Sequence, residues 1–220
     1  MIKIKKDGFT LSEVLITLSI VGVIAALVVP GVIKDINNKA MMSLLQGTVT
    51  NINDAVQTEI SVKKISSLED TDICRNTMNF LNKLDVAKEG DAFATKYTTL
   101  RGEDHGNAAG VPYQVQLKNG VSVGLIHKYY NLDSSIVVID LNGPKEPNII
   151  GVDYFTLELQ WKNDETQNTH LGNLGGYQKR SKLNSDDPAK LKDSCIKGES
   201  DDCYSLIELS GFNPNYLNEM

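Results

Sequence analysis

The chain has 220 residues, a formal net charge of −6 at pH 7 and 41% apolar side chains. This length allows one helical rod and one globular domain of about 100 to 150 residues, which excludes a second domain of that size. The acidic balance disfavours nonspecific binding to the phosphates of nucleic acid, with the basic run at residues 179–182 as a local exception.

The N-terminus combines a short basic segment with one long apolar stretch. Lys3, Lys5 and Lys6 precede a run from Val14 to Ile33 that contains no charged residue. About 20 apolar residues in a helix span the ~30 Å of a bilayer core. Because basic flanks stay in the cytoplasm, the rest of the chain is predicted to lie outside it. A cleaved secretory signal peptide is the alternative, but residues 25–30 form a poor site for that cleavage.

One acid, Glu13, stands at the edge of this apolar run, where an unpaired carboxylate costs about 2 to 3 kcal/mol. It ends the sequence GFTLSE at residues 8–13, which lies between the basic leader and an apolar helix containing Pro30. This pattern resembles the processing motif of type IV pilins and type II secretion pseudopilins. The small residue before the cut, the aromatic residue after it, the acid and the distal proline are all present.

The resemblance implies a filament-forming structural subunit that needs no cofactor. A prepilin peptidase would cut between Gly8 and Phe9 and methylate the new amine of Phe9. In the assembly scheme of the family, Glu13 then pairs with the N-terminal amine of a neighbouring subunit, and losing one partner of such a buried pair costs about 3 to 5 kcal/mol. The alternative is that Glu13 is an interfacial residue outside the filament core. Other pilin or pseudopilin subunits, an inner-membrane platform protein and an assembly ATPase are the further expected partners.

The resemblance and the sequence pattern together divide the chain into four segments. Residues 1–8 are the cytoplasmic leader that is removed, and residues 9–33 form the transmembrane and filament-core helix. Residues 34–64 continue this helix as an amphipathic half, and residues 65–220 form a globular domain. That domain is expected in the periplasm while the protein is anchored in a bacterial inner membrane, and in the periplasm or outside the cell after assembly. The amphipathic half carries apolar residues three or four positions apart, namely Met41, Leu45, Val49, Ile52, Val56 and Ile60.

Beyond the long helix, the pattern predicts a second helix, a loop and then strands. Residues 66–70 have the composition of a helix start, so a helix is expected from about residue 68 to residue 84. The polar, glycine-containing residues 88–110 are predicted as a loop. Alternating patterns predict a hairpin and two further strands, at residues 113–117, 121–126, 135–140 and 154–159. The predicted fold class is therefore α+β and pilin-like, with the long helix packed on a C-terminal antiparallel sheet.

The predicted connection between the last two strands, residues 140–153, contains a second motif. It resembles the D-x-N-G…P-N…G-x-D loop of many pseudopilin-like secretion proteins, and major pseudopilins use a calcium ion in a similar loop. The side-chain oxygens of Asp140, Asn142 and Asp153 are hard ligands that suit Ca²⁺. The alternative is a turn without metal, because Asp and Asn bond the local backbone and Gly adopts positive φ. The glutamate that would close an EF-hand is absent at the required distance, and both interpretations remain open.

Three cysteines, Cys74, Cys195 and Cys203, are available for pairing. An oxidising periplasm favours a disulfide, and Cys195 with Cys203 would close a short acidic segment with a glycine bend, similar to the C-terminal cysteine pair of pilin-like proteins. A bond from Cys74 to either of the others is the alternative. A metal site of these cysteines is not expected, since no histidine lies at ligand spacing.

The sequence contains no recognisable enzyme motif. Its three histidines are far apart, no serine lies in a nucleophile elbow, and no phosphate-binding glycine loop precedes a helix. The resemblance described above implies that the chain is a subunit of a type II secretion pseudopilus or a related type IV pilus. The alternative is a minor pilin at the filament tip that binds a surface, a substrate protein or DNA. Glu13 favours the first function, because family members that cap the tip often lack this acid.

Overall fold

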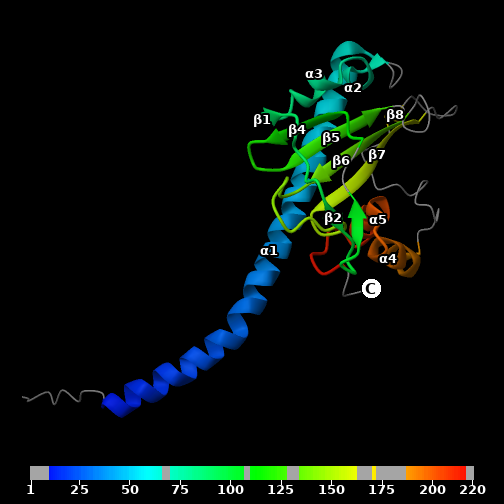
Figure 1. Ribbon diagram of the computed structural model, residues 1–220. Coiled ribbons are helices and arrows are strands. Elements are labelled where there is room, and N and C mark those ends of the chain that lie inside the picture. The colour runs from blue at the N-terminus through cyan, green and yellow to red at the C-terminus, as the bar shows by residue number, and fades with distance from the viewer. Residues whose placement is uncertain are drawn as a thin grey trace, which may run out of the picture. The chain divides into compact units, whose positions relative to one another are not determined.

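The structure, a computed structural model, describes residues 10–65, 70–106, 110–127, 134–162, 170–171 and 187–216. Its first element is the long helix α1, Leu11–Lys63, which precedes a sheet and four shorter helices (Figure 1). The chain forms two compact units, of which the first ends at Ala40 and the second begins at Met41. Helix α1 contributes residues to both units.

The first part of α1 has the composition of a membrane span. Its most apolar window has a mean hydropathy of 2.6, and none of that window is buried in the structure. By length and composition this helix is able to cross a membrane. Pro30 lies inside α1, and the helix continues beyond it to Lys63.

The second part of α1 contributes one face to the core of the globular unit. Leu45, Val49, Ile52 and Val56 are buried, as their spacing predicts. Met42 is buried at the start of this stripe, whereas Met41 and Ile60 are only partly buried against the core. The stripe joins the inner side chains of the sheet in a single hydrophobic cluster.

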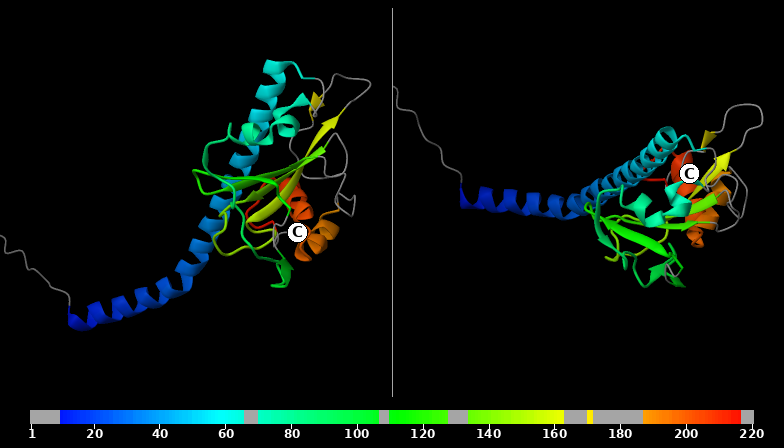
Figure 2. Two further views of the ribbon diagram at one scale, coloured as in Figure 1. Left: turned by 45° about the horizontal axis from the view of Figure 1, so that its top comes forward. Right: turned by 90° about the horizontal axis from the view of Figure 1, so that it is seen from above.

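The sheet has six strands in the order β1-β4-β5-β6-β7-β8, and each neighbouring pair is antiparallel. Its four central strands, at or near the positions predicted from alternation, are β4 Tyr113–Leu117, β5 Ser122–His127, β6 Ser134–Asp140 and β7 Tyr154–Lys162. The edges are β1, Val86–Glu89, and β8, His170–Leu171. Val123, Ile139 and Phe155 are paired across β5, β6 and β7 and form the middle of the buried face. Two further views of this sheet are shown in Figure 2, in which α5 packs beside β7 and α4 beside α5.

The predicted helix over residues 68–84 is two short helices in the described part of this range. They are α2, Asp72–Arg75, and α3, Thr77–Leu81. Asn76 separates them because its backbone leaves the helical region, with φ −149° and ψ 67°. Its side-chain oxygen accepts a hydrogen bond from the backbone N–H of Asn79 at 3.4 Å, which caps α3. Residues 66–69, where the helix start was expected, lie outside the described residues.

The prediction of a loop over residues 88–110 was wrong. Besides the end of β1, this range contains β2, Tyr97–Thr98, and β3, Asp104–Gly106, which pair with each other. Thr98 also bonds the segment before β7, donating its N–H to the carbonyl of Asn148 and accepting from the N–H of Ile150, both at 2.9 Å. Strands of two or three residues are too short to show a period of two, so alternation gave no signal.

The segment around Cys195 and Cys203 is a pair of helices rather than a loop. They are α4, Pro188–Ile196, and α5, Ser200–Leu209. Asp187 caps α4 by accepting a hydrogen bond from Ala189 N–H at 3.0 Å, and Gly198 makes the turn between the helices with φ 102°. Residues 204–207, in the middle of α5, are buried.

Candidate functional site

Glu13 is held at the start of α1 by the residue that precedes the helix. The Glu13 carboxylate accepts hydrogen bonds from the backbone N–H of Thr10 at 2.8 Å and from its hydroxyl at 2.7 Å. In return, the Thr10 oxygen accepts from the Glu13 N–H at 3.3 Å. This reciprocal arrangement is a capping box, which the spacing Thr-x-x-Glu signals and which sequence reasoning missed. Gly8 and Phe9, the expected cleavage and methylation residues, lie outside the described residues.

The polar side chains that follow on α1 also have partners within the helix. The Thr17 hydroxyl donates to the carbonyl of Glu13 at 2.9 Å, and the Ser19 hydroxyl donates to the carbonyl of Leu15 at 2.8 Å. Such internal bonds satisfy hydroxyl groups that have no water available in a bilayer. The large apolar side chains of this part of α1, from Leu11 to Ile36, are exposed. A surface of this kind requires an apolar environment from outside the chain.

The loop between β6 and β7 is closed by its own hydrogen bonds. Asp140 accepts from the Tyr97 hydroxyl at 2.5 Å and from the backbone N–H of Asn142 at 3.2 Å. The Asn142 amide donates to the carbonyl of Pro147 at 2.9 Å, and Asp153 accepts from the Ile149 N–H at 2.7 Å. These contacts are typical of a polar turn, in which Asp and Asn side chains bond the local backbone.

The two aspartates of this loop are nevertheless in an unfavourable environment. Both are completely buried, and burial raises the pKa of Asp140 to about 7 and that of Asp153 to about 6. The charge of Asp153 raises the pKa of Asp140 further. Among the described residues, no lysine or arginine forms an ion pair with either carboxylate.

Two oxygens beside these charges are buried without a hydrogen-bond partner, Asn142 Oδ1 and Asp153 Oδ2. A buried acceptor without a partner is costly, and carboxylate and amide oxygens are ligands that Ca²⁺ prefers. The residues therefore fit a calcium ion. Within the described part of the chain, no three side chains from His, Cys, Asp and Glu gather as a metal cluster, so the amide of Asn142 and backbone carbonyls would have to complete the ligand set.

Comparison with known families bears on the N-terminal helix. Residues 3–29 match the family described as the prokaryotic N-terminal methylation motif, which is the signature of type IV pilins and pseudopilins. The chain carries the type IV pilin signature. No curated protein and no solved structure matches the chain at a significant level.

This signature bears on the class of the pilin-like chain, its processing and its anchoring. It marks a family of structural subunits rather than of enzymes, and it implies processing by a prepilin peptidase and assembly with other pilin subunits. Together with the apolar first part of α1, it fits anchoring in a membrane. The long helix followed by an antiparallel sheet is the pilin-like arrangement expected from the sequence.

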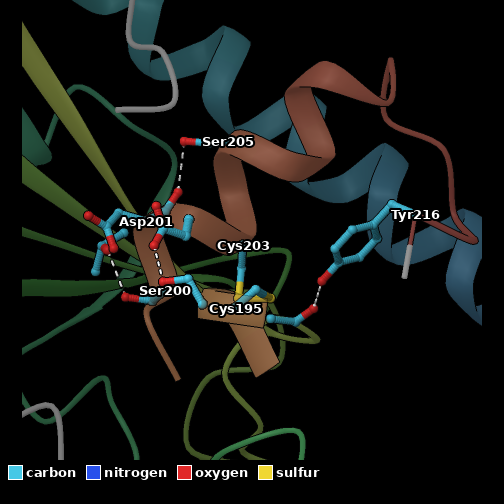
Figure 3. The surroundings of a disulfide bond; sticks show 10 residues. Cys195, Ser200, Asp201, Cys203, Ser205 and Tyr216 are labelled. Carbon is cyan, nitrogen blue, oxygen red and sulfur yellow. Dashed lines mark hydrogen bonds between the residues drawn. A yellow bond between two sulfur atoms is a disulfide. The ribbon is translucent and has the colours of Figure 1, made fainter. Parts of the chain in front are cut away.

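The cysteines of the pilin-like chain lie on three different helices. Cys195 on α4 and Cys203 on α5 are joined by a disulfide, with 4.7 Å between their Cα atoms (Figure 3). Both are fully buried, and their sulfurs face Gly151 in the loop between β6 and β7. Cys74 lies on α2, partly buried and outside the disulfide. The bond links α4 to α5 on either side of the turn between them.

A second group of polar residues was missed by sequence reasoning. These residues connect the end of α1 with α2 and with Lys83, which follows α3. Glu59 is buried on α1 and accepts from Lys63 and Lys83, each at 3.1 Å. Asp72 accepts from the same two lysines at 2.7 and 2.8 Å, and these bonds lower its pKa to about 2. The backbone N–H of Asp72 donates to Glu59. We call Glu59, Lys63, Asp72 and Lys83 the charge network. Its signal in the sequence was Glu59, an acid that continues the spacing of the apolar stripe on α1.

Proposed function

We propose that this protein is a filament-forming subunit of a type II secretion pseudopilus or a related type IV pilus machine. A prepilin peptidase cuts it after Gly8 and methylates the amine of Phe9. The observation that carries the proposal is the overlap of the methylation motif, at residues 3–29, with a helix whose most apolar window has no buried residue. An inner-membrane platform protein and a cytoplasmic ATPase system would drive assembly of such a subunit.

The exposed apolar helix has two environments available in this function. Before assembly the bilayer covers it, and afterwards the same helix of neighbouring subunits does. Because lipid tails are as apolar as leucine, this exchange costs little, and close packing of helices then decides the contact. Gly22 and Gly31 support such packing, because residues without a side chain let the backbones of two helices approach closely.

The orientation follows from the same features. The lysines before Gly8 keep the leader in the cytoplasm, so the globular unit lies on the periplasmic side of the inner membrane. A buried disulfide in that unit supports an oxidising compartment. Glu13, capped by Thr10 within one chain, would exchange this partner for the N-terminal amine of a neighbour in the filament.

Mass spectrometry of the protein extracted from membranes tests this function. We expect a chain that begins at Phe9 and carries one added methyl group. A variant with Gly8 replaced by a bulky residue should keep its leader, because a side chain there blocks the close approach of a protease to the backbone. Replacing Asp7 by Asn leaves Gly8 intact and serves as the control. A wild-type chain that retains its first eight residues, or is cut beyond Val29, would overturn the proposal.

We also propose that the loop between β6 and β7 holds a calcium ion. Asp153 and Asn142 each offer a buried oxygen without a partner, and Asp140 adds negative charge beside them. The ion would neutralise two buried carboxylates and tie the loop to the end of the sheet. This proposal favours a pseudopilus over a pilus, because of the resemblance of residues 140–153 to the pseudopilin loop.

Calorimetry and melting curves of the processed protein in detergent micelles test the ion. At pH 7.5 we expect heat of binding and a melting temperature several degrees higher in millimolar calcium than in EDTA. Asp153→Asn should lose most of this increase, whereas Asp85→Asn, which changes an exposed acid paired with Lys118, should keep it. No heat and no rise in melting temperature for the wild-type protein would end the calcium hypothesis.

A further inference from the structure

Gly151 lies where three separate parts of the chain meet. It belongs to the loop between β6 and β7 and has a φ of 84°, which favours glycine. A Cβ at this position would lie 2.8 Å from Sγ of Cys203 and 3.0 Å from Sγ of Cys195. The hydroxyl of Tyr216 donates a hydrogen bond to the carbonyl of Gly151, as the dashed line from Tyr216 in Figure 3 marks. The disulfide and Tyr216 therefore both lie against the backbone of Gly151.

This peptide unit belongs to the turn that carries Asp153. The carbonyl of Ile149 accepts from the N–H groups of Val152 at 3.0 Å and Asp153 at 3.2 Å, and the Gly151 N–H donates to the carbonyl of Tyr154 at 3.1 Å. The Asp153 carboxylate closes the turn by accepting from the Ile149 N–H at 2.7 Å. A displacement of Gly151 would therefore shift the backbone that aims the Asp153 side chain.

We propose that the Cys195–Cys203 disulfide and the Tyr216 hydroxyl are positioning groups for Asp153, and that the disulfide and a calcium ion in this loop stabilise each other. The inference rests on the calcium site proposed above. The disulfide and Tyr216 order the turn before the ion binds, so calcium binding does not include the entropy cost of ordering the turn. Groups that orient a ligand in this way commonly change metal affinity by about 10-fold to 100-fold.

Thermodynamic linkage makes the coupling reciprocal. If calcium binds the oxidised protein more tightly than the reduced one, calcium must favour the oxidised protein by the same factor. Dithiothreitol donates two electrons and two protons, which convert the disulfide into two thiols while the reagent closes to its cyclic disulfide. We expect calcium to shift this equilibrium toward the protein disulfide by about 10-fold, and sodium chloride at equal ionic strength to leave it unchanged.

Binding measurements on the processed full-length protein in detergent micelles test the proposal. The variants are Tyr216→Phe and the double change Cys195→Ser with Cys203→Ser. Matched controls are Tyr113→Phe, which removes a hydroxyl on β4, and Cys74→Ser, which removes the thiol on α2. We expect the Kd for calcium to rise about 10-fold in both test variants and to stay unchanged in both controls.

The calcium-dependent part of the melting temperature separates positioning from mere stabilisation. A purely structural role would lower the melting temperature equally in calcium and in EDTA, whereas positioning reduces the difference between the two. If the wild-type protein binds calcium and the test variants bind it equally well, the inference is overturned while the calcium site stands. If the oxidised wild-type protein binds no calcium, the site and the inference both fail, so the two failures are distinguishable.

Discussion

Asp140 and Asp153 are two of the residues whose protonation should govern how the globular unit responds to pH; burial also raises the pKa of Asp201, to about 6. The pKa values of Asp140 and Asp153 are about 7 and about 6 in the folded protein, raised by burial from 3.8. The folded state thus binds protons more tightly than the unfolded chain. The protonated carboxyl groups therefore contribute their full stabilisation below about pH 4, and this contribution is lost as the pH rises toward 7. We therefore expect the melting temperature in EDTA to be higher at pH 5 than at pH 8.

The Asp140→Asn variant tests the source of this pH dependence. An amide does not titrate, so the difference in melting temperature between pH 5 and pH 8 should shrink. Asp85→Asn serves as the control, since that acid is exposed on the surface. Calcium at pH 8 should recover part of the loss by pairing with the ionised carboxylates. A melting temperature that rises from pH 5 to pH 8 in EDTA would contradict the assigned burial cost.

Glu13 has two separable properties, its charge and its hydrogen bonds to Thr10. Glutamine at this position still accepts from the Thr10 N–H and so keeps a capping box, but it carries no charge. If an ion pair with a neighbouring amine drives assembly, Glu13→Gln should block incorporation into filaments nearly as well as Glu13→Ala. Quantitative immunoblotting of sheared filaments measures this. Normal incorporation of Glu13→Gln would instead assign the role to the helix cap. Ser19→Ala, which removes a hydroxyl bonded to the carbonyl of Leu15, is the control.

At the scale of elements, the charge network joins the end of α1 to the short helices that follow. Glu59 is buried, and Lys63 and Lys83 are its two cationic partners. Lys83→Ala removes one of these and leaves Glu59 with a single cation, which we expect to cost about 1.5 to 3 kcal/mol of unfolding free energy. Denaturant unfolding measures it. Lys88→Ala on β1 is the matched control, and an equally small effect of both changes would refute a stabilising network.

The long elements of the fold could be predicted from sequence because each repeats one pattern over many residues. The stripe on α1 and the alternation in β4 to β7 have this property. Short elements lack it: β2 and β3, which pair with each other, have only two and three residues, and β2 also depends on a partner far along the chain through the bridge between Thr98 and Ile149. The helix α5 was missed because the chemistry of its first residues, Ser200 to Cys203, resembled a polar loop between cysteines.

The candidate sites divide along the same line. Glu13, Pro30 and the residues near Gly8 form a local motif, so neighbouring sequence positions were enough to find them. Asp153 was expected beside Asp140 from the loop motif, but the hydrogen bond from the Tyr97 hydroxyl was not visible, because Tyr97 lies 43 residues from Asp140 in the sequence. The same is true of Gly151, whose contacts come from α4, α5 and the C-terminal Tyr216. Burial and long-range contacts decide these properties, and both require the fold.

At the scale of the whole molecule, the membrane anchor and the globular core are carried by different stretches of one helix. All of the exposed apolar surface of α1 up to Ile36 precedes the second compact unit, which begins at Met41. The buried stripe starts at Met42, so a chain starting at Met41 keeps every core residue that α1 supplies. We expect this truncated protein to be soluble and monomeric, and to form the disulfide without detergent.

Size-exclusion chromatography and circular dichroism test this division of labour. A matched truncation that starts at Ala55 removes Met42, Leu45, Val49 and Ile52 as well. Losing four large buried side chains at about 2 to 5 kcal/mol each is comparable to the whole stability of a domain, about 5 to 15 kcal/mol. That shorter chain should therefore not fold, although it differs from the first only within α1. If the chain from Met41 formed stable oligomers, contacts of the globular unit would drive assembly. The proposed role of the exposed part of α1 as the main contact between subunits would then be wrong.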